Sequence, residues 1–434
     1  MKIEMFHLMP YRELPSDFDE RYRSVWVDPP ISLMDPLAVH RMYNETLDEL
    51  EYAAATGFDG VCVNEHHENA YGLMPSPNIM AAALARRTRD AAVIVLGNSI
   101  ALYNPPIRVA EEFAMLDNIS GGRIIAGFPV GTSQDTNFAY GTNPATLRDR
   151  YYEAEELIVK AWTEPEVFSF DGKFTQLRYV NLWPRPLQKP HPPIWIPGGG
   201  SIETWQWTLE KHYLYAYLSY AGFRRGQRVM DGFWRTADEL NIAPNPYHAG
   251  FLQLVAVGET ESEVSDKFGP HGEYFYNKML HVYPGYADAP GYRTIDTIRA
   301  GLLGQTTRFG DRPPKLSWKD LREQGNIIAG TPKQVSEQLE QVIKDLRVGH
   351  LMLLNQFGSI PHDLAMENIR QTATKVVPNL RHIWDDAWQD EWWIHPIASP
   401  RPPAALTGPL ALQPVGAGFK PARARMPAAA ALDS

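Results

Sequence analysis

The sequence predicts a fold of the α/β class, built as an eight-stranded parallel barrel. Short, apolar, β-rich runs alternate with longer segments of helical periodicity, a pattern typical of parallel strands joined by helices. The number of strand-like runs matches the eight strands of a closed (β/α)8 barrel. The chain has 434 residues, enough for one large barrel with insertions. The predicted strands span residues 3–8, 60–64, 93–98, 123–128, 193–197, 213–218, 251–257 and 350–354.

Helical patterns fill the connections between these strands. Thr331 followed by Pro332 predicts a helix start, because it places an N-cap residue before a proline at the first helical position. Gly121 and Gly349 follow predicted helices, where a left-handed cap favours glycine. Tryptophans at positions 384, 388, 392 and 393 recur at roughly helical spacing and predict a final helix that packs through them. The other predicted helices span residues 37–56, 78–89, 106–120, 146–163 and 332–346.

Two segments, 165–192 and 259–330, interrupt this alternation. Asp171 and Gly172 lie between aromatic-rich runs and predict a β-hairpin in the first segment. The second segment is rich in Tyr, Gly and Pro, and insertions of this kind usually lie at the mouth of a barrel and shape its pocket. After Trp393 the composition changes to Pro and Ala, so we expect residues 1–395 to form the barrel and 396–434 to be a disordered tail.

Composition and charge exclude several classes of protein. The chain contains 41 Lys and Arg against 51 Asp and Glu, a net charge of −10, which disfavours a nucleic-acid binder. Its single cysteine, Cys62, cannot form an intramolecular disulfide and lies in an apolar strand, where we expect it to pack. No apolar run reaches the length of a membrane span, and the N-terminus has no signal-peptide pattern. We therefore expect a soluble, cytoplasmic protein.

A first candidate site follows the second predicted strand, where residues 64–68 read Asn-Glu-His-His-Glu. Side chains of a strand alternate between its faces, so Asn64 and His66 share one face while Glu65 and His67 share the other. Only one imidazole therefore faces the barrel axis, where it is suited to general acid and base chemistry. Two histidines that only pack and form hydrogen bonds are the alternative. A shared metal ion is not expected, because neighbouring strand residues diverge.

A second candidate site is the turn that follows the strand at 193–197. Gly199 and Gly200 allow close approach of a ligand to the backbone, and Ser201 begins a helix whose free N–H groups attract an anion. The turn lacks the lysine of a Walker loop and the glycine spacing of a dinucleotide-binding motif. It predicts a phosphate site, with a plain strand-to-helix turn as the alternative.

Two further segments carry candidate binding residues. Arg150 offers a bidentate donor to phosphate, and Tyr151 offers a hydroxyl group or a ring face. The alternative is a solvated helix face with Tyr151 in the core. Asn98, between a glycine and a serine after the third predicted strand, is placed to bond the polar edge of a planar ligand.

Taken in order, these motifs resemble the bacterial luciferase-like, flavin-dependent monooxygenase family. The resemblance covers about residues 1–258 and 326–383 and depends on an ordered series of motifs rather than on one. The matching segments are Gly60-Val61-Cys62-Val63-Asn64-Glu65-His66-His67, Val95-Leu96-Gly97-Asn98-Ser99, Pro106-Ile107-Arg108-Val109-Ala110-Glu111, Leu116-Asp117-Asn118-Ile119-Ser120-Gly121-Gly122-Arg123, Arg150-Tyr151-Tyr152-Glu153, Pro184-Arg185-Pro186-Leu187-Gln188-Lys189-Pro190-His191-Pro192-Pro193-Ile194, the glycine-rich turn, and Gly330-Thr331-Pro332.

The resemblance implies a TIM-like (β/α)8 barrel that binds reduced FMN at its C-terminal mouth, with His66 as the catalytic base. It also implies a non-proline cis peptide at Ser99–Ile100. Pro129 and Val130 stand where the luciferase α subunit has a cysteine and an arginine, so light emission is not expected. The FMN contacts that the resemblance implies are Asn98 beside the ring, Arg150, Tyr151, and the phosphate turn of Gly199, Gly200 and Ser201.

The function implied is that of the oxygenase component of a two-component monooxygenase. Such a protein uses reduced FMN and O2 to oxygenate a small organic substrate, and a separate NAD(P)H-dependent flavin reductase supplies the FMN. The sequence contains no second nucleotide-binding domain, which favours an external reductase. A homodimer is expected from the resemblance alone. The alternatives are a deazaflavin-dependent oxidoreductase of the same superfamily and a non-catalytic flavin-binding barrel.

Overall fold

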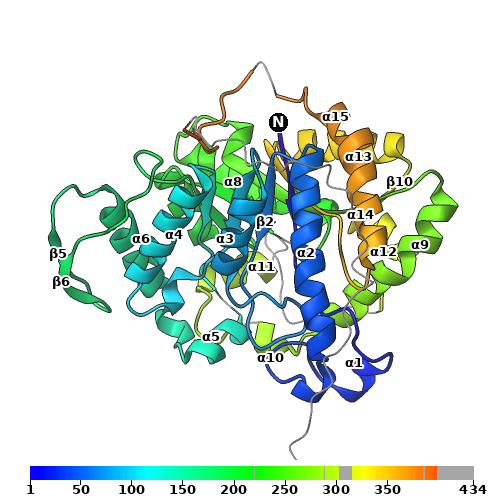
Figure 1. Ribbon diagram of the computed structural model, residues 1–434, viewed down its shortest axis with the longest axis horizontal. Helices are drawn as coiled ribbons and strands as arrows, with labels where there is room; N and C mark the ends of the chain where they lie inside the picture. The colour runs from blue at the N-terminus through cyan, green and yellow to red at the C-terminus, as the bar shows by residue number, and fades with distance from the viewer. Residues whose placement is uncertain (132, 219, 288, 303–314, 385–386, 398–434) are drawn as a thin grey trace, which may run out of the picture. The chain divides into compact units, whose positions relative to one another are not determined.

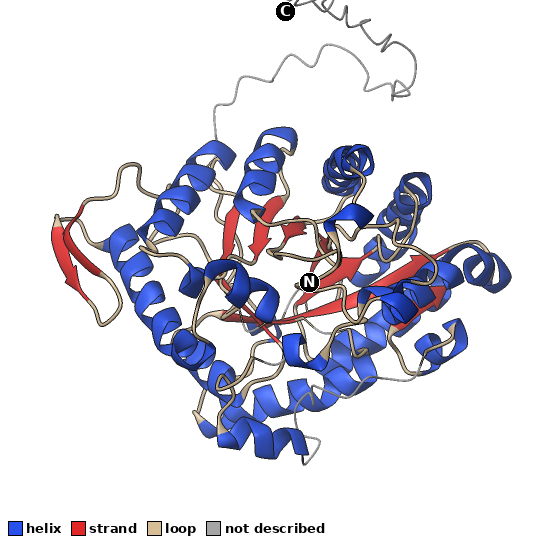
Figure 2. Ribbon diagram, turned by 90° about the horizontal axis from the view of Figure 1, so that it is seen from below, coloured by secondary structure: helices blue, strands red, loops and turns tan. Residues whose placement is uncertain are grey.

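The barrel strands close into one parallel barrel surrounded by helices (Figure 2). The computed structural model describes residues 1–131, 133–218, 220–287, 289–302, 315–384 and 387–397. Each barrel strand pairs in parallel with its two neighbours, and the circle closes where the last strand pairs with the first. The predicted fold class is confirmed, and each predicted strand is present. In order around the barrel, the strands are β1 (Lys2–Phe6), β2 (Gly60–Val63), β3 (Ala92–Leu96), β4 (Ile124–Gly127), β7 (Ile194–Gly198), β8 (Leu214–Tyr217), β9 (Ala249–Val257) and β11 (His350–Leu354).

One further strand, β10 (Ile327–Gly330), lies outside the closed barrel. β8 pairs with the first residues of β9, and β10 pairs in parallel with the second half of β9. In this ladder Ile327 is opposite Leu254 and Gly330 is opposite Val257. This strand was not predicted, because its four residues end a long segment rich in turn-forming residues.

The helices cover the outside of the barrel, and Figure 1 shows α2, α3 and α4 side by side on one flank. The predicted helices at 37–56, 78–89, 106–120, 146–163 and 332–346 are all present, the last with the predicted bounds and the others with bounds shifted by at most two residues. The helices are α1 (Phe18–Arg21), α2 (Pro36–Thr56), α3 (Pro77–Arg87), α4 (Ile107–Ser120), α5 (Gln134–Tyr140), α6 (Leu147–Thr163), α7 (Ile202–Glu210), α8 (Phe223–Glu239), α9 (Glu261–Tyr274), α10 (Pro284–Ala287), α11 (Ile295–Leu302), α12 (Trp318–Glu323), α13 (Pro332–Leu346), α14 (His362–Gln371) and α15 (Val377–Leu380).

The ends of these helices follow the expected chemistry at two of three positions. Thr331 caps α13, and its hydroxyl accepts a hydrogen bond from the backbone of Gln334. Gly121 ends α4 in the left-handed region with φ 77°. After α13, however, Arg347 takes the left-handed position, with φ 53°. Gly349 is needed for another reason, because a Cβ atom there would lie 2.6 Å from a ring atom of Tyr247.

The predicted final tryptophan helix is wrong. The chain beyond α15 instead crosses the N-terminal end of the barrel, and Trp384 has a positive φ of 70°. The Trp392 indole donates a hydrogen bond to the His212 carbonyl oxygen at 2.9 Å, and the Trp195 indole donates to the Trp392 carbonyl oxygen at 3.0 Å. Trp392 packs as expected, whereas Trp388 is 40% exposed, and the spacing of the tryptophans belongs to a segment that covers the end of the barrel.

Both predicted insertions are present. Residues 165–192 contain the antiparallel hairpin of β5 (Phe168–Asp171) and β6 (Gln176–Val180), which projects from the side of the barrel (Figure 1). Residues 259–330 contain α9, a π-helical turn at Phe275–Met279, α10, α11, α12 and β10. Figure 1 places α10 beside α5 at the end of the molecule opposite the N-terminus, where the C-terminal ends of the strands lie. The predicted disordered tail spans residues 396–434. Residues 398–434 of it lie outside the described part of the chain.

Within the described ranges, no helix is both long and apolar enough to cross a lipid bilayer.

Candidate functional site

A cavity of about 290 Å³ lies at the C-terminal ends of the barrel strands. This is the end at which barrels of this class place their ligand sites. The insertion at 259–330 contributes part of the cavity wall, as the sequence predicted. Of the predicted site residues, His66, Gly199, Gly200 and Ser201 line the cavity, whereas Asn98, Arg150 and Tyr151 do not. The lining residues are Phe6, Asn64, Glu65, His66, Tyr71, Leu96, Gly97, Ser99, Pro129, Val130, Gly131, Ser133, Thr136, Pro197, Gly198, Gly199, Gly200, Ser201, Thr204, Leu218, Tyr220, Ala287, Tyr292, Arg293 and Thr297.

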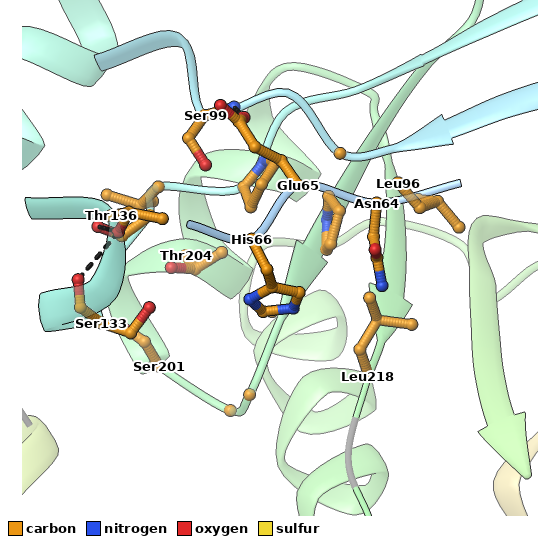
Figure 3. A pocket seen from close by; sticks show the side chains of 18 of the residues that line it. Asn64, Glu65, His66, Leu96, Ser99, Ser133, Thr136, Ser201, Thr204 and Leu218 are labelled. Carbon is orange, nitrogen blue, oxygen red and sulfur yellow. Dashed lines mark hydrogen bonds between the residues drawn. The ribbon is translucent and has the colours of Figure 1, made fainter. Parts of the chain in front are cut away.

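His66 follows β2, and its ring lies in the middle of the cavity (Figure 3). Nδ1 of the ring lies 3.2 Å from Oδ2 of Asp135, and the edge of the ring packs against Tyr71 with centroids 4.8 Å apart. The side chain remains 20% exposed. Because Asp135 engages Nδ1, Nε2 is the ring nitrogen that is left for a ligand.

Asp135 comes from the first turn of α5 and is fully buried. Its carboxylate also accepts a hydrogen bond from Nδ2 of Asn69 at 2.9 Å. Burial alone would raise the pKa of Asp135, but the hydrogen bond and charge of His66 outweigh it and hold this pKa below its usual value. A charged carboxylate therefore orients the imidazole. The sequence analysis missed Asp135 because it lies 69 residues from its partner and in no recognisable motif.

Asn98 lies behind the cavity wall rather than in it. Its side chain is fully buried and donates to Oε2 of Glu65 at 3.2 Å and to the Tyr103 hydroxyl at 3.0 Å. Glu65 also accepts from the backbone N–H of Ser99 at 2.6 Å, so this carboxylate fixes the chain that follows β3. Its neighbours Gly97 and Ser99 line the cavity instead.

The non-proline cis peptide also differs in position from the expectation. It joins Leu96 to Gly97 rather than Ser99 to Ile100. Gly97 has no room for a side chain, because a Cβ atom would lie 2.1 Å from a ring carbon of Pro129.

The glycine turn after β7 forms one side of the cavity, as predicted. Gly200 has φ 104°, and a Cβ atom there would lie 3.2 Å from Val229. Ser201 is the N-cap residue of α7, and its hydroxyl group receives a hydrogen bond from Nη2 of Arg148 at 3.3 Å. Thr204, in the first turn of α7, adds a second hydroxyl group to this side. Glycine amides, hydroxyl groups and an arginine are the donors that a phosphate group requires.

Arg148, and not Arg150, is the arginine at this turn. The guanidinium of Arg150 lies over the ring of Phe174, 4.6 Å from its centroid. Tyr151 is buried, and its hydroxyl donates to the Phe128 carbonyl oxygen at 2.7 Å, so it belongs to the core. The two arginines are only two positions apart on α6, so they point in different directions around the helix. The predicted arginine was that of the motif, whereas the structure brings the other one into contact with Ser201 and Tyr292, two residues of the cavity wall.

A carboxylate also lies at this turn. Glu203 accepts hydrogen bonds from the hydroxyl of Ser201 at 2.7 Å, from Thr297 at 2.8 Å and from Thr294. Partial burial would raise the pKa of Glu203, but these hydrogen bonds outweigh it and hold this pKa below its usual value. The two threonines flank the start of α11, so Glu203 ties the insertion to the glycine turn. A second tie joins the hydroxyl of Tyr292 to Arg148 at 2.8 Å.

The donor set fits a flavin phosphate on the side of the glycine turn. The opposite side offers a buried amide, Asn64, whose Oδ1 has no hydrogen-bond partner among the described residues. Such an atom is expected to receive a ligand donor. Within the described ranges, no three His, Cys, Asp or Glu side chains gather to hold a metal ion. Cys62 is fully buried inside the barrel, and burial raises the pKa of its thiol, as expected for a packing residue.

Known proteins are similar to this chain in sequence. The uncharacterized protein y4wF of Sinorhizobium fredii is 30% identical over 336 residues, 76% of this chain and 90% of that protein. The oxygenase component of flavin-dependent trigonelline monooxygenase from Acinetobacter baylyi is 29% identical over 161 residues, 36% of this chain and 43% of its own.

Two solved structures share the fold at low sequence identity. The oxygenating constituent of 3,6-diketocamphane monooxygenase from Pseudomonas putida, in complex with FMN, superposes with a TM-score of 0.65 at 16% identity, covering 88% of this chain and 98% of that one. An F420-dependent secondary alcohol dehydrogenase superposes with a TM-score of 0.57 at 16% identity, covering 88% of this chain and 99% of that one. The sequence model of the luciferase-like monooxygenase family matches residues 29–349. The match spans most of the chain and confirms the recognition made from the motifs, so this protein belongs to the luciferase-like monooxygenase family.

Proposed function

We propose that this protein is the oxygenase component of a two-component monooxygenase that uses reduced FMN and O2 to oxygenate a small organic substrate. The observation that carries the proposal is the pairing of His66 with the buried Asp135 in the centre of a cavity whose other side is a phosphate-type turn. When bound, reduced FMN supplies the electrons that activate dioxygen. The residues of the chain bind, orient and exchange protons.

In this proposal, the glycine turn and Arg148 hold the phosphate, and Gly97 and Ser99 lie against the flavin ring. Nε2 of His66 exchanges the proton that the reaction requires at the reacting centre. Asp135 keeps the other ring nitrogen protonated and stabilises the imidazolium when it forms. Asp135 is therefore a positioning residue.

The insertion excludes water in this proposal. Tyr292, Arg293 and Thr297 come from the segment that Glu203 and Arg148 tie to the rim of the cavity. Exclusion of water is important for an oxygenase because it limits unproductive release of hydrogen peroxide.

The proposal includes a separate NAD(P)H-dependent flavin reductase as partner. The relative from Acinetobacter baylyi and the diketocamphane enzyme are both named as oxygenating components, which supports this part. NAD(P)H is a cytoplasmic reductant, so we place the protein in the cytoplasm.

We also propose a homodimer that forms through α3 and α4. These neighbouring helices expose Ile79, Met115 and Ile119, whose relative exposures are 70%, 48% and 37%. Apolar side chains exposed on adjacent helices are a feature of interfaces between subunits. Ile79→Glu is expected to convert the dimer to a monomer in light scattering, and a wild-type monomer would refute this part.

A second candidate is a deazaflavin-dependent oxidoreductase, and the position of Glu203 favours it. A charged carboxylate beside the glycine turn repels a phosphate monoester with two charges more than a phosphodiester with one. Binding of FMN and of F420 to the wild-type protein distinguishes the two candidates, since the cofactor that binds more tightly identifies the reaction class. A non-catalytic flavin barrel, the third possibility, gives no role to the His66 and Asp135 pair.

The decisive test is turnover with ¹⁸O2 and reduced FMN supplied by a flavin reductase. Incorporation of label into a substrate supports the proposal, and oxygen-independent hydride transfer from reduced F420 would overturn it. His66→Ala is expected to bind FMN normally and to release hydrogen peroxide in place of most of the product. Unchanged coupling in this variant would remove His66 from the mechanism.

A further inference from the structure

The cavity has two chemically different halves, which meet at the ring of His66. In Figure 3, Asn64 and Leu218 lie on one side of this ring, and Ser133 and Ser201 lie on the other. The side of Ser201 is rich in hydroxyl groups and glycine amides. The side of Asn64 is mostly apolar.

Two arginines lie at the hydroxyl half, against the single carboxylate of Glu203. Arg148 donates to Ser201 and to the hydroxyl of Tyr292, and Arg293 follows Tyr292 in the cavity wall. The balance of charge therefore favours an anionic group of a ligand in this half.

The apolar half contains the buried polar side chain of Asn64. Phe6 and Leu96 are almost fully buried in its wall, and Leu218 completes it. Asn64 is only 4% exposed, and its Oδ1 has no hydrogen-bond partner among the described residues. A buried amide without a partner destabilises a protein that binds nothing there. The unpaired Oδ1 of Asn64 in an apolar wall therefore indicates a ligand that donates a hydrogen bond to it.

We propose that Asn64 recognises the substrate, which is a compact, uncharged organic molecule with an N–H or O–H donor, such as a primary amide. This donor pairs with Oδ1 of Asn64, while the hydrocarbon body packs against Phe6, Leu96 and Leu218. The inference rests on the proposed function, because it assigns the hydroxyl half to the flavin phosphate and leaves the apolar half to the substrate.

The charges around the cavity select against an ionic substrate. Among the described residues of its wall, the acidic and basic side chains apart from His66 are Glu65 and Arg293. Glu65 is already engaged by Ser99, Asn98 and other donors, and Arg293 belongs to the hydroxyl half. While the His66 imidazole is neutral, a carboxylate or ammonium group beside Asn64 would lose its hydration without gaining an opposite charge.

The strand geometry links recognition to chemistry. Asn64 and His66 are two residues apart where β2 ends, so their side chains point to the same side of the chain. A group held by Asn64 lies beside the imidazole. Asn64 thus sets which substrate atom faces the reacting centre, and we expect its loss to change specificity more than proton transfer.

The test uses the full-length protein and three probes of similar size, namely benzamide, benzoate and toluene. Their dissociation constants are measured by ligand-observed NMR in the presence of FMN. We expect wild type to prefer benzamide to benzoate by at least tenfold. Asn64→Leu is expected to weaken benzamide binding by about tenfold and to leave toluene binding unchanged or tighter. Asn44→Leu, the same substitution on the exposed side of α2, is the matched control and is expected to change neither.

Two results would overturn the inference. Benzamide that binds Asn64→Leu as well as wild type would remove the amide from substrate recognition, and an equal loss of FMN affinity would assign Asn64 to the cofactor. Thermal melting gives an independent readout, because leucine in place of an unpaired amide should not lower the melting temperature. A clear decrease, in Asn64→Leu and also in Asn64→Asp, would assign the amide a structural role instead.

Failure of the proposed function has a different signature. In that case the wild-type protein neither binds FMN nor incorporates oxygen. If only this inference fails, both properties are retained, and Asn64→Leu keeps the preference for benzamide.

Discussion

Replacement of Arg148 by methionine tests the cofactor side of the cavity. The guanidinium lies 3.3 Å from the Ser201 hydroxyl and 2.8 Å from that of Tyr292, at the turn to which we assign the FMN phosphate. A hydrogen bond to a charged partner contributes about 1.5–3 kcal/mol, or roughly 10- to 100-fold in affinity. Because Ser201 and Tyr292 already use part of the donor capacity of this guanidinium, we expect the lower end, about a tenfold increase in the dissociation constant of FMN.

The assay compares two ligands and two variants by quenching of flavin fluorescence. Arg148→Met is expected to weaken binding of FMN and to leave binding of riboflavin, which has no phosphate, unchanged. Arg150→Met is the matched control, because its guanidinium lies over Phe174, away from the cavity. If Arg150→Met weakened FMN binding as much as Arg148→Met, or if Arg148→Met weakened riboflavin binding equally, the assignment of the phosphate site would be wrong.

Three further predictions concern charged groups. Asp135→Asn is expected to decrease product formation by about 10- to 100-fold with FMN affinity unchanged, measured by steady-state turnover, and full activity would show that the carboxylate does not position the imidazole. Glu203→Gln removes a negative charge at the glycine turn and is expected to tighten FMN binding severalfold in the same fluorescence titration; weaker binding would contradict the repulsion argued above. Burial opposes the charge of His350, but Asp390 and Glu4 outweigh it and raise the pKa of His350 to about 9. Since this folded-state pKa lies above the usual value of 6.5, the stabilisation, about 3 kcal/mol at most, is complete below pH 6.5 and lost as pH rises through 9. Thermal melting should therefore decrease over this range in wild type and not in His350→Gln, and parallel profiles would refute the assignment.

The barrel was predictable from the sequence because local chemistry and periodicity agree at each strand. The strand at Gly60–Val63 is uniformly apolar, and Thr331 is the N-cap residue of the helix that starts at Pro332. The tryptophans after α15 are the opposite case. Their spacing fits a helix, but Trp392 and Trp393 are held by partners more than 100 positions away, such as Trp195, and the chain follows those contacts.

The candidate site was predictable only in part. His66 and Ser201 lie in short motifs at strand ends, so their place at the mouth follows from the fold. The direction of a helical side chain is harder to predict, and for this reason Arg150 was chosen where Arg148 reaches the turn. Asp135 becomes a partner of His66 only when α5 packs across the mouth, which no local pattern indicates.

The pairing of β10 with β9 has a consequence for engineering. The insertion that shapes the cavity leaves the barrel at Val257 and returns at Ile327, and these two ends are held in register by one short parallel ladder. The insertion can therefore be exchanged as a unit, because the pairing of β9 with β10 fixes the positions of its two ends. A segment from another member of the family, joined at these two points, should replace the part of the cavity wall that Tyr292, Arg293 and Thr297 form without altering the closure of the barrel. This side of the cavity is thus open to transplantation as a single block.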